Sequence, residues 1–254
     1  MTAVTASTPS SPFGRAWRTV RLLTTNPWTV IGWPLVILGA IFVMTWTIWW
    51  LIFASVDPAD LTETADGIRF NGAVSYIFVY MLVISVQAVN LAFPLALGFG
   101  STRRAFSLGS GLAFVLLSAA YAVVLTIGAW LEELTDGWGL HGAFFRTFYL
   151  ATDAGWLAQW WIYFCWFVFF FFTGTIFAAM YVRWKALGLT AAFVALGVLV
   201  VATIAVLTLT ATWHLFWEAL AELGTIGIAS AALVPAVLAA VVGYLVLRRA
   251  TPRG

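Results

Sequence analysis

The chain has 254 residues, of which 63% are hydrophobic and only 9% are charged, and its formal net charge is +2. A single soluble core of this length cannot bury so much apolar surface, which excludes a soluble globular protein and indicates an integral membrane protein. The single cysteine, Cys165, also excludes a disulfide framework and a cysteine-based metal cluster.

The N-terminal residues divide into two parts. Residues 1–10 are rich in Thr, Ser and Ala and carry no charge, so we expect a disordered tail before a single membrane domain of residues 11–254. Residues 11–26 predict an amphipathic helix at the membrane interface that ends before Pro27. Its apolar face carries Phe13, Trp17 and Val20, and its basic face carries Arg15 and Arg18.

Six apolar runs follow, each long enough to cross about 30 Å of hydrocarbon, which takes about 20 residues. We expect helices, because a segment in lipid must satisfy its own backbone hydrogen bonds and the runs lack the alternation of barrel strands. The sequence therefore predicts an all-α integral membrane protein with six transmembrane helices. The runs are residues 28–54, 72–97, 108–131, 155–181, 186–209 and 226–247.

The connections between these runs alternate in charge. The positive-inside rule places the basic connections, and with them both termini, in the cytoplasm of a cell-membrane protein. Because the inner leaflet explains these basic residues, we expect membrane lipid but no nucleic acid as a partner. The basic set is Arg15, Arg18, Arg21, Arg103, Arg104, Arg183, Lys185, Arg248, Arg249 and Arg253. The outer set is Asp57, Asp60, Glu63, Asp66, Glu132, Glu133, Asp136, Asp153, Glu218 and Glu222.

Ionisable residues are absent from the middle of the six runs. A carrier driven by protons or sodium usually keeps such groups there, which disfavours a secondary carrier. The polar side chains at that depth are amides and hydroxyls, and Gln87 and Asn90 share one helix face. Together with Thr45 and Thr173 they either line a substrate path or form hydrogen bonds between helices.

The motifs of ATP binding and hydrolysis are also missing. No glycine-rich loop ends in Gly-Lys-Ser or Gly-Lys-Thr, and the only lysine, Lys185, lies at a membrane edge. The two histidines, His141 and His214, lie in outer connections without the partners of a hydrolase site. We therefore expect this chain to be no enzyme, with no catalytic residue, no metal site and no cofactor.

The connection between the second and third runs carries the most particular residues. It reads Phe-Pro-Leu-Ala-Leu-Gly-Phe-Gly-Ser-Thr-Arg-Arg-Ala-Phe over residues 93–106. Its glycines allow a sharp turn, Arg103 and Arg104 stay charged, and Phe106 supplies an apolar anchor. This combination exceeds what a positive-inside turn requires and favours a contact with a cytoplasmic protein.

In this turn and in the layout of its spans, the chain resembles the membrane subunit of type-2 ABC exporters, in particular small six-span actinobacterial permeases. The resemblance implies a homodimer or heterodimer of permeases with two separate ATPase subunits, which bind ATP and Mg²⁺. It also implies that the interfacial helix, with Arg15, Trp17 and Arg18, rests beside the turn. The residues implied to contact the ATPase are Gly100, Ser101, Thr102, Arg103, Arg104 and Phe106.

The outer side of the chain departs from larger members of that family, because it offers no sizeable outer domain. Its third outer connection, residues 210–225, has helical spacing and predicts only a short helix on the outer leaflet. The sequence thus predicts an export permease for an amphiphilic or apolar substrate such as a drug, peptide or lipid-like molecule. The alternative is a non-transporting membrane scaffold or immunity-type subunit that binds a partner through the same turn.

Overall fold

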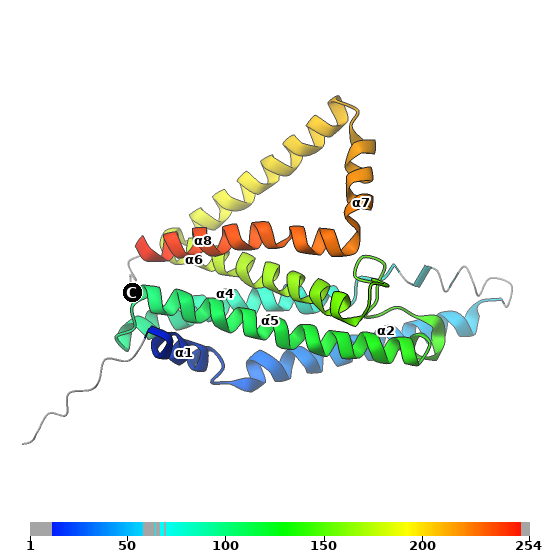
Figure 1. Cartoon of the computed structure of the whole chain (residues 1–254), viewed down its shortest axis with the longest axis horizontal. Coiled ribbons are helices and arrows are strands. Elements are labelled where there is room, and N and C mark those ends of the chain that lie inside the picture. The colour runs from blue at the N-terminus through cyan, green and yellow to red at the C-terminus, as the bar shows by residue number, and fades with distance from the viewer. Residues whose placement is uncertain (1–11, 58–63, 65–66, 69, 250–254) are drawn as a thin grey trace, which may run out of the picture.

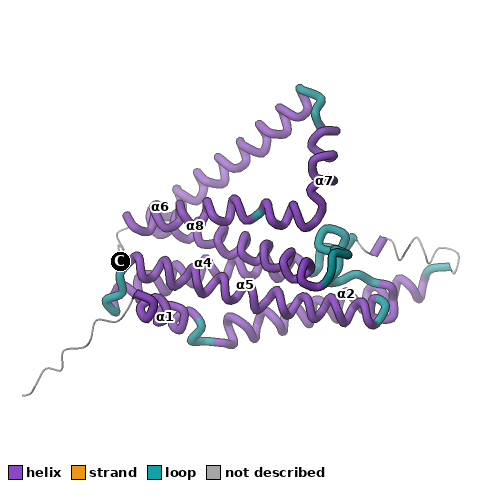
Figure 2. The backbone as a smooth tube through the Cα atoms, viewed as in Figure 1, coloured by secondary structure: helices purple, strands orange, loops and turns teal. Residues whose placement is uncertain are grey.

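The computed structural model describes residues 12–57, 64, 67–68 and 70–249, and the described backbone is helical without a strand (Figure 2). The predicted all-α class is therefore confirmed, whereas the predicted tail of residues 1–10 lies outside the described residues. The helices are α1 (Pro12–Leu23), the π-helix η1 (Trp28–Gly32), α2 (Trp33–Ser55), α4 (Ser75–Gly98), α5 (Arg103–Leu134), the π-helix η3 (Gly137–His141), α6 (Trp156–Leu209), α7 (Trp213–Ala231) and α8 (Leu233–Arg249).

Five helical segments of the described chain are long and apolar enough to cross a membrane. The sequence predicted six runs, and the difference arises because the fourth and fifth runs continue into each other as α6, which has 54 residues. The backbone of α6 is nevertheless not helical at Lys185, where φ is 56° and ψ is −149°. The five segments are Trp28–Ser55, Ser75–Gly98, Arg103–Leu134, Trp156–Leu209 and Trp213–Arg248.

The part of α6 that follows Lys185 leaves the helix bundle, and α7 returns toward it (Figure 1). Near the end of α7 the chain turns a corner at Gly224, whose φ of 59° and ψ of −178° suit glycine alone. Helix α7 begins at Trp213, within residues 210–225, where the sequence predicted a short helix, and it continues to Ala231. These segments and α8 outline an open triangle beside the bundle.

The charged residues gather at opposite ends of the bundle. Helix α1, the α4–α5 turn, the break in α6 and the end of α8 lie at one end, which we call the basic end (Figure 1). The α2–α4 and α5–α6 connections lie at the other, acidic end. Basic and acidic connections alternate along the sequence, and in the structure the two kinds lie at opposite ends of the bundle.

Helices α4 and α6 cross without room for a side chain at Gly174. A Cβ atom added to Gly174 would collide with the Ser85 hydroxyl and with the Leu82 backbone of α4. Aromatic pairs extend the contact toward the N-terminal ends of both helices, with Phe78 and Phe167 4.7 Å apart between ring centroids. Small residues allow such close approach of helices in membranes, where packing rather than the hydrophobic effect drives association.

The connection from α5 to α6 is held by the carboxylate of Glu132, which is 4% exposed. Its Oε2 accepts hydrogen bonds from the backbone N–H groups of Phe144 (2.7 Å) and Phe145 (2.9 Å), and its Oε1 accepts one from Arg146 (2.9 Å). The indole of Trp138 also donates to Oε2, at 3.2 Å. One buried carboxylate therefore satisfies four donors of the connection and fixes it on α5.

We expect Gly174→Ala to destabilise the protein by about 1–3 kcal/mol, because the added methyl group forces α4 and α6 apart. Thermal unfolding of the purified protein in detergent measures the loss. Gly197→Ala is the matched control in the same helix, because a Cβ atom there meets nothing within 4 Å. An equal effect of the two substitutions would contradict the close crossing at Gly174.

We expect Glu132→Ala to cost about 2 kcal/mol or more, because it leaves several buried N–H groups without an acceptor. The α5–α6 connection should also become open to limited proteolysis. Glu133→Ala serves as the control, since Glu133 pairs with Arg146 at a half-exposed position and such pairs contribute about 0–1 kcal/mol. A connection that remains resistant in Glu132→Ala would show that the carboxylate does not hold it.

Candidate functional site

The turn between α4 and α5 is built by local backbone chemistry. The N–H of Ser101 donates to the Ala96 carbonyl (2.9 Å) and that of Gly100 to Leu97 (3.0 Å), the pattern of a glycine-terminated helix end. Gly100 has a φ of +78°, which glycine adopts without strain. Thr102 then caps α5, because its hydroxyl accepts a hydrogen bond from the N–H of Ala105 at 3.2 Å.

Phe106 anchors this turn in the core. Its side chain is fully buried, and its ring meets that of Phe93 edge-on at 5.3 Å between centroids. Although the sequence grouped Phe106 with the partner-facing residues, its side chain is therefore not on the exposed surface. Gly100, Thr102 and Arg104 are exposed, and Ser101 and Arg103 are half-buried.

The two arginines of the turn have different surroundings. Arg103 donates from Nη1 to the carbonyl oxygen of Arg248 at 2.7 Å and so ties the turn to the C-terminal end of α8. Arg104 is exposed and, within the described part of the chain, forms no hydrogen bond or ion pair. The exposed ring of Phe99, at 78% exposure, lies at the tip of the same turn and was not among the predicted residues.

Helix α1 packs across α5 close to this turn. At Gly109 the helices touch so closely that a Cβ atom would meet the backbone oxygen of Ala16 and the side chain of Thr19. Ala16, Thr19 and Val20 are buried in this contact region. Trp17, predicted on the apolar face, is 44% exposed. Arg18 is exposed as predicted, and the side chain of Arg15 lies outside the described residues.

The four residues predicted for a substrate path occupy different surroundings. Gln87 is exposed and lines a groove beside α1, whereas Asn90 has a buried Oδ1 without a hydrogen-bond partner. Thr173 is half-buried and precedes the close crossing at Gly174. Thr45 is half-buried and precedes Trp46, whose indole donates to the backbone of the α5–α6 connection at 3.2 Å. No hydrogen bond joins any two of the four.

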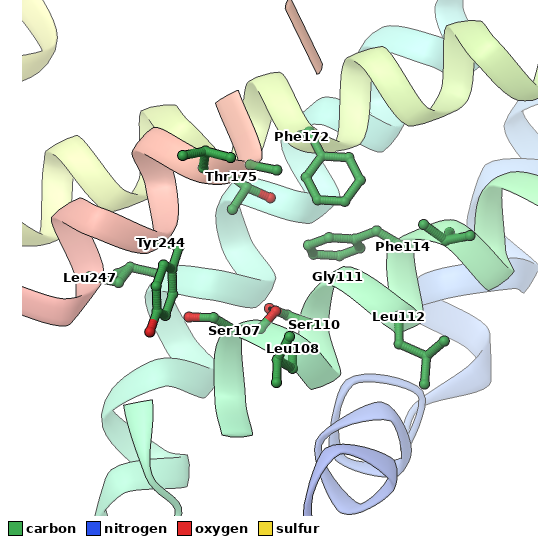
Figure 3. A pocket seen from close by; sticks show the side chains of 13 residues that line it. Ser107, Leu108, Ser110, Gly111, Leu112, Phe114, Phe172, Thr175, Tyr244 and Leu247 are labelled. Carbon is green, nitrogen blue, oxygen red and sulfur yellow. The ribbon is translucent and has the colours of Figure 1, made fainter. Parts of the chain in front are cut away.

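A different set of residues lines an apolar cavity of about 440 Å³ between α5, α6 and α8 (Figure 3). The hydroxyls of Ser107, Ser110 and Tyr244 gather on one side of it, and the rings of Phe114 and Phe172 lie on another. The remaining lining residues are Leu108, Gly111, Leu112, Val115, Thr175, Ala240, Val241 and Leu247. The cavity is thus apolar with a cluster of hydroxyls, as a site for an amphiphilic molecule requires.

Ser107 connects the cavity with the turn. It lies one helical turn after Arg104, so the wall of the cavity begins where the basic turn ends. Its Oγ is buried and has no hydrogen-bond partner, although a buried hydroxyl is costly to leave unpaired. Ser110 satisfies its own hydroxyl by donating to the Ser107 carbonyl at 3.2 Å. A ligand that hydrogen-bonds to Ser107 would remove this cost.

Sequence reasoning missed Ser107, Ser110 and Tyr244 because they lie within or beside apolar runs without a motif. The only available signal was two serines three residues apart on one face of the third helix. Nothing in the sequence indicates that this face meets α8.

No protein-family model, curated protein or solved structure matches the chain. Among the described residues, no group of three or more His, Cys, Asp or Glu side chains lies close enough to hold a metal ion. The basic turn and the cavity next to it on α5 are therefore the features from which a function is inferred.

We expect Ser107→Ala to leave the stability of the detergent-purified protein equal or higher, by up to about 1 kcal/mol, because it removes an unpaired buried hydroxyl. Ser118→Ala in the same helix should instead lower stability slightly, since the Ser118 hydroxyl donates to the Phe114 carbonyl at 2.7 Å. Thermal unfolding of the two variants side by side makes the comparison. A larger loss in Ser107→Ala than in Ser118→Ala would mean that Ser107 has a structural partner.

Proposed function

We propose that this chain is the membrane subunit of an ATP-driven exporter of the type-2 ABC kind, which moves an amphiphilic or apolar molecule outward. The observation that carries the proposal is the placement of the basic turn and the cavity on successive turns of α5. A force applied to the turn would reach the cavity wall through one rigid helix.

Six membrane spans fit this proposal better than five. Helix α6 would measure about 80 Å at 1.5 Å per residue, more than twice the roughly 30 Å thickness of the hydrocarbon. The non-helical backbone at Lys185 divides it into two segments of spanning length, next to the basic residues Arg183 and Lys185. With α1 and the end of α8 at the same basic end, the positive-inside rule favours a cytoplasmic location for both termini.

The basic turn is the proposed contact with a separate ATPase subunit. That partner would supply the ATP and Mg²⁺ chemistry, since this chain has no phosphate-binding loop. The exposed Arg104 and Phe99 offer a charge and an apolar ring to the partner. The contact of Arg103 with Arg248 would carry motion of the turn to α8, another wall of the cavity. A second permease copy would complete the transporter.

The cavity is the proposed substrate site. Its aromatic walls suit an apolar chain or ring system, and its hydroxyls suit one polar group of the same molecule. The unpaired Ser107 hydroxyl gives that polar group a defined position. Because the cavity lies near the basic end, an amphiphile would enter from the cytoplasmic leaflet in the proposed orientation.

The coupling contact is tested by Arg104→Glu in the chain co-purified with its proposed ATPase partner. We expect retention of the ATPase to fall at least tenfold, because the change reverses the charge at an exposed contact while leaving the Arg103–Arg248 tie in place. Pull-down yield and ATP turnover measure the effect. Arg183→Glu, at another basic connection, is the matched control and should leave both unchanged.

An Arg104→Glu complex with full retention and full ATP turnover would overturn the coupling assignment. Reconstitution of the unaltered complex in liposomes separates the exporter from a membrane scaffold. An exporter shows ATP turnover that rises with an amphiphilic substrate, whereas a scaffold shows no such response.

A further inference from the structure

Helix α1 and the start of the first membrane segment form an elbow with a polar pocket on its surface. The pocket, of about 470 Å³, is lined by Arg18, Arg21, Leu22, Thr24 and Thr25. A second, mainly apolar groove of about 230 Å³ runs between the elbow and α4. Leu22 and Thr25 line both, so the polar pocket and the groove adjoin each other.

The pocket has positive charge without a counter-charge. Arg18 and Arg21 lie three residues apart on α1 and are both exposed. Within the described part of the chain neither forms an ion pair; the ion pairs of carboxylates there involve Arg146 and His141, in the α5–α6 connection. Two guanidinium groups on one face are thus available to a single anion.

The C-terminal carbonyl groups of α1, which would repel an anion at this place, are partly occupied by hydrogen bonds. The Val20 carbonyl accepts hydrogen bonds from both the N–H and the hydroxyl of Thr24, each at 3.0 Å. The Arg21 carbonyl accepts one from the Thr25 hydroxyl at 2.7 Å. Because these carbonyls are already paired, the negative end of the helix is partly neutralised.

The groove supplies an apolar path with one free amide along it. Ile84, Ala88 and Leu91 line it from α4, one helical turn apart, with Leu22 opposite them. Gln87 lies among them, is exposed, and forms no hydrogen bond within the described chain. An amide in an apolar groove suits a ligand with a carbonyl group close to its hydrocarbon chain.

We propose that the pocket and groove hold one anionic phospholipid. Its phosphate lies between Arg18 and Arg21, its ester carbonyl accepts a hydrogen bond from the Gln87 amide, and an acyl chain follows Ile84, Ala88 and Leu91. A free phosphate, a nucleotide or an acidic peptide would leave the groove unfilled. Anionic lipid is also concentrated where a basic interfacial helix lies, because each arginine near the surface attracts it.

Such a lipid would hold α1 against α4 as well as against α5. The elbow residues Leu22 and Leu23 pack only partly against the core, and the groove separates them from Ala88 and Leu91 of α4. An acyl chain in the groove fills that space with apolar contact. The lipid site requires only that the chain is a membrane protein, so it stands apart from the proposed transport function.

The test measures lipid retained by the intact, detergent-purified protein in native mass spectrometry. Phosphatidylglycerol is added as the anionic lipid and phosphatidylcholine as the zwitterionic one, with inorganic phosphate as a chain-free competitor. We expect the unaltered protein to retain one phosphatidylglycerol, not displaced by phosphate. Arg18→Gln with Arg21→Gln should reduce this retention at least tenfold, with little effect on phosphatidylcholine. Arg183→Gln, at another inner basic connection, is the control and should retain the lipid.

A second variant, Ala88→Leu, fills the groove without changing any charge. We expect it to reduce retention of phosphatidylglycerol severalfold while size-exclusion chromatography shows an unchanged protein. The proposal is overturned if the double arginine variant keeps the lipid, or if Arg183→Gln loses it equally, which would mean diffuse charge attraction. It is also overturned if inorganic phosphate displaces the lipid, or if Ala88→Leu has no effect.

Discussion

The contact of Phe106 with Phe93 determines the geometry of the basic end. It joins the last part of α4 to the first turn of α5, and both rings are fully buried. Successive residues of a helix point about 100° apart, so burying Phe106 sets the directions of its neighbours. Arg104 is thereby held outside, and Ser107 is held at the cavity. A smaller residue at 106 would loosen the turn and the cavity wall together.

Helix α5 links the basic end of the bundle to the acidic end. Its 32 residues span about 48 Å. At the acidic end, Glu132 binds the backbone of the following connection through four hydrogen bonds. Both ends of α5 are thus fixed to neighbouring segments, by an aromatic contact at one end and a buried carboxylate at the other. Such a helix transmits a displacement along its axis instead of bending.

The sequence predicted the features that follow from composition and local rules. Apolar length predicted the helices, charge predicted the two ends, and the glycines of the turn predicted a sharp change of direction, but the start of α5 at Arg103 lies five residues before the predicted run. Helix pairing was beyond its reach, because lipid-facing and protein-facing sides of a membrane helix are both apolar and show little periodicity. The contact of Ser107 with the same cavity as Tyr244, and the crossing at Gly174, could therefore not be predicted. The sequence also does not tell which apolar residues of α1 meet the protein, because an interfacial helix has an apolar side for lipid as well: Val20 is buried, whereas Trp17 is 44% exposed.

Three features converge on the same two turns of α5. The basic turn ends at Arg104, the cavity begins at Ser107, and α1 presses on the backbone at Gly109 between the cavity residues Leu108 and Ser110. At Gly109 the backbone of α5 lies directly against Ala16 and Thr19 of α1, so a shift of α1 would act on α5. A lipid held between the elbow and α4 would then bias the position of the cavity wall. The proposed lipid site and the proposed substrate cavity would thus be coupled through the contact of α1 with α5 and need no shared residue.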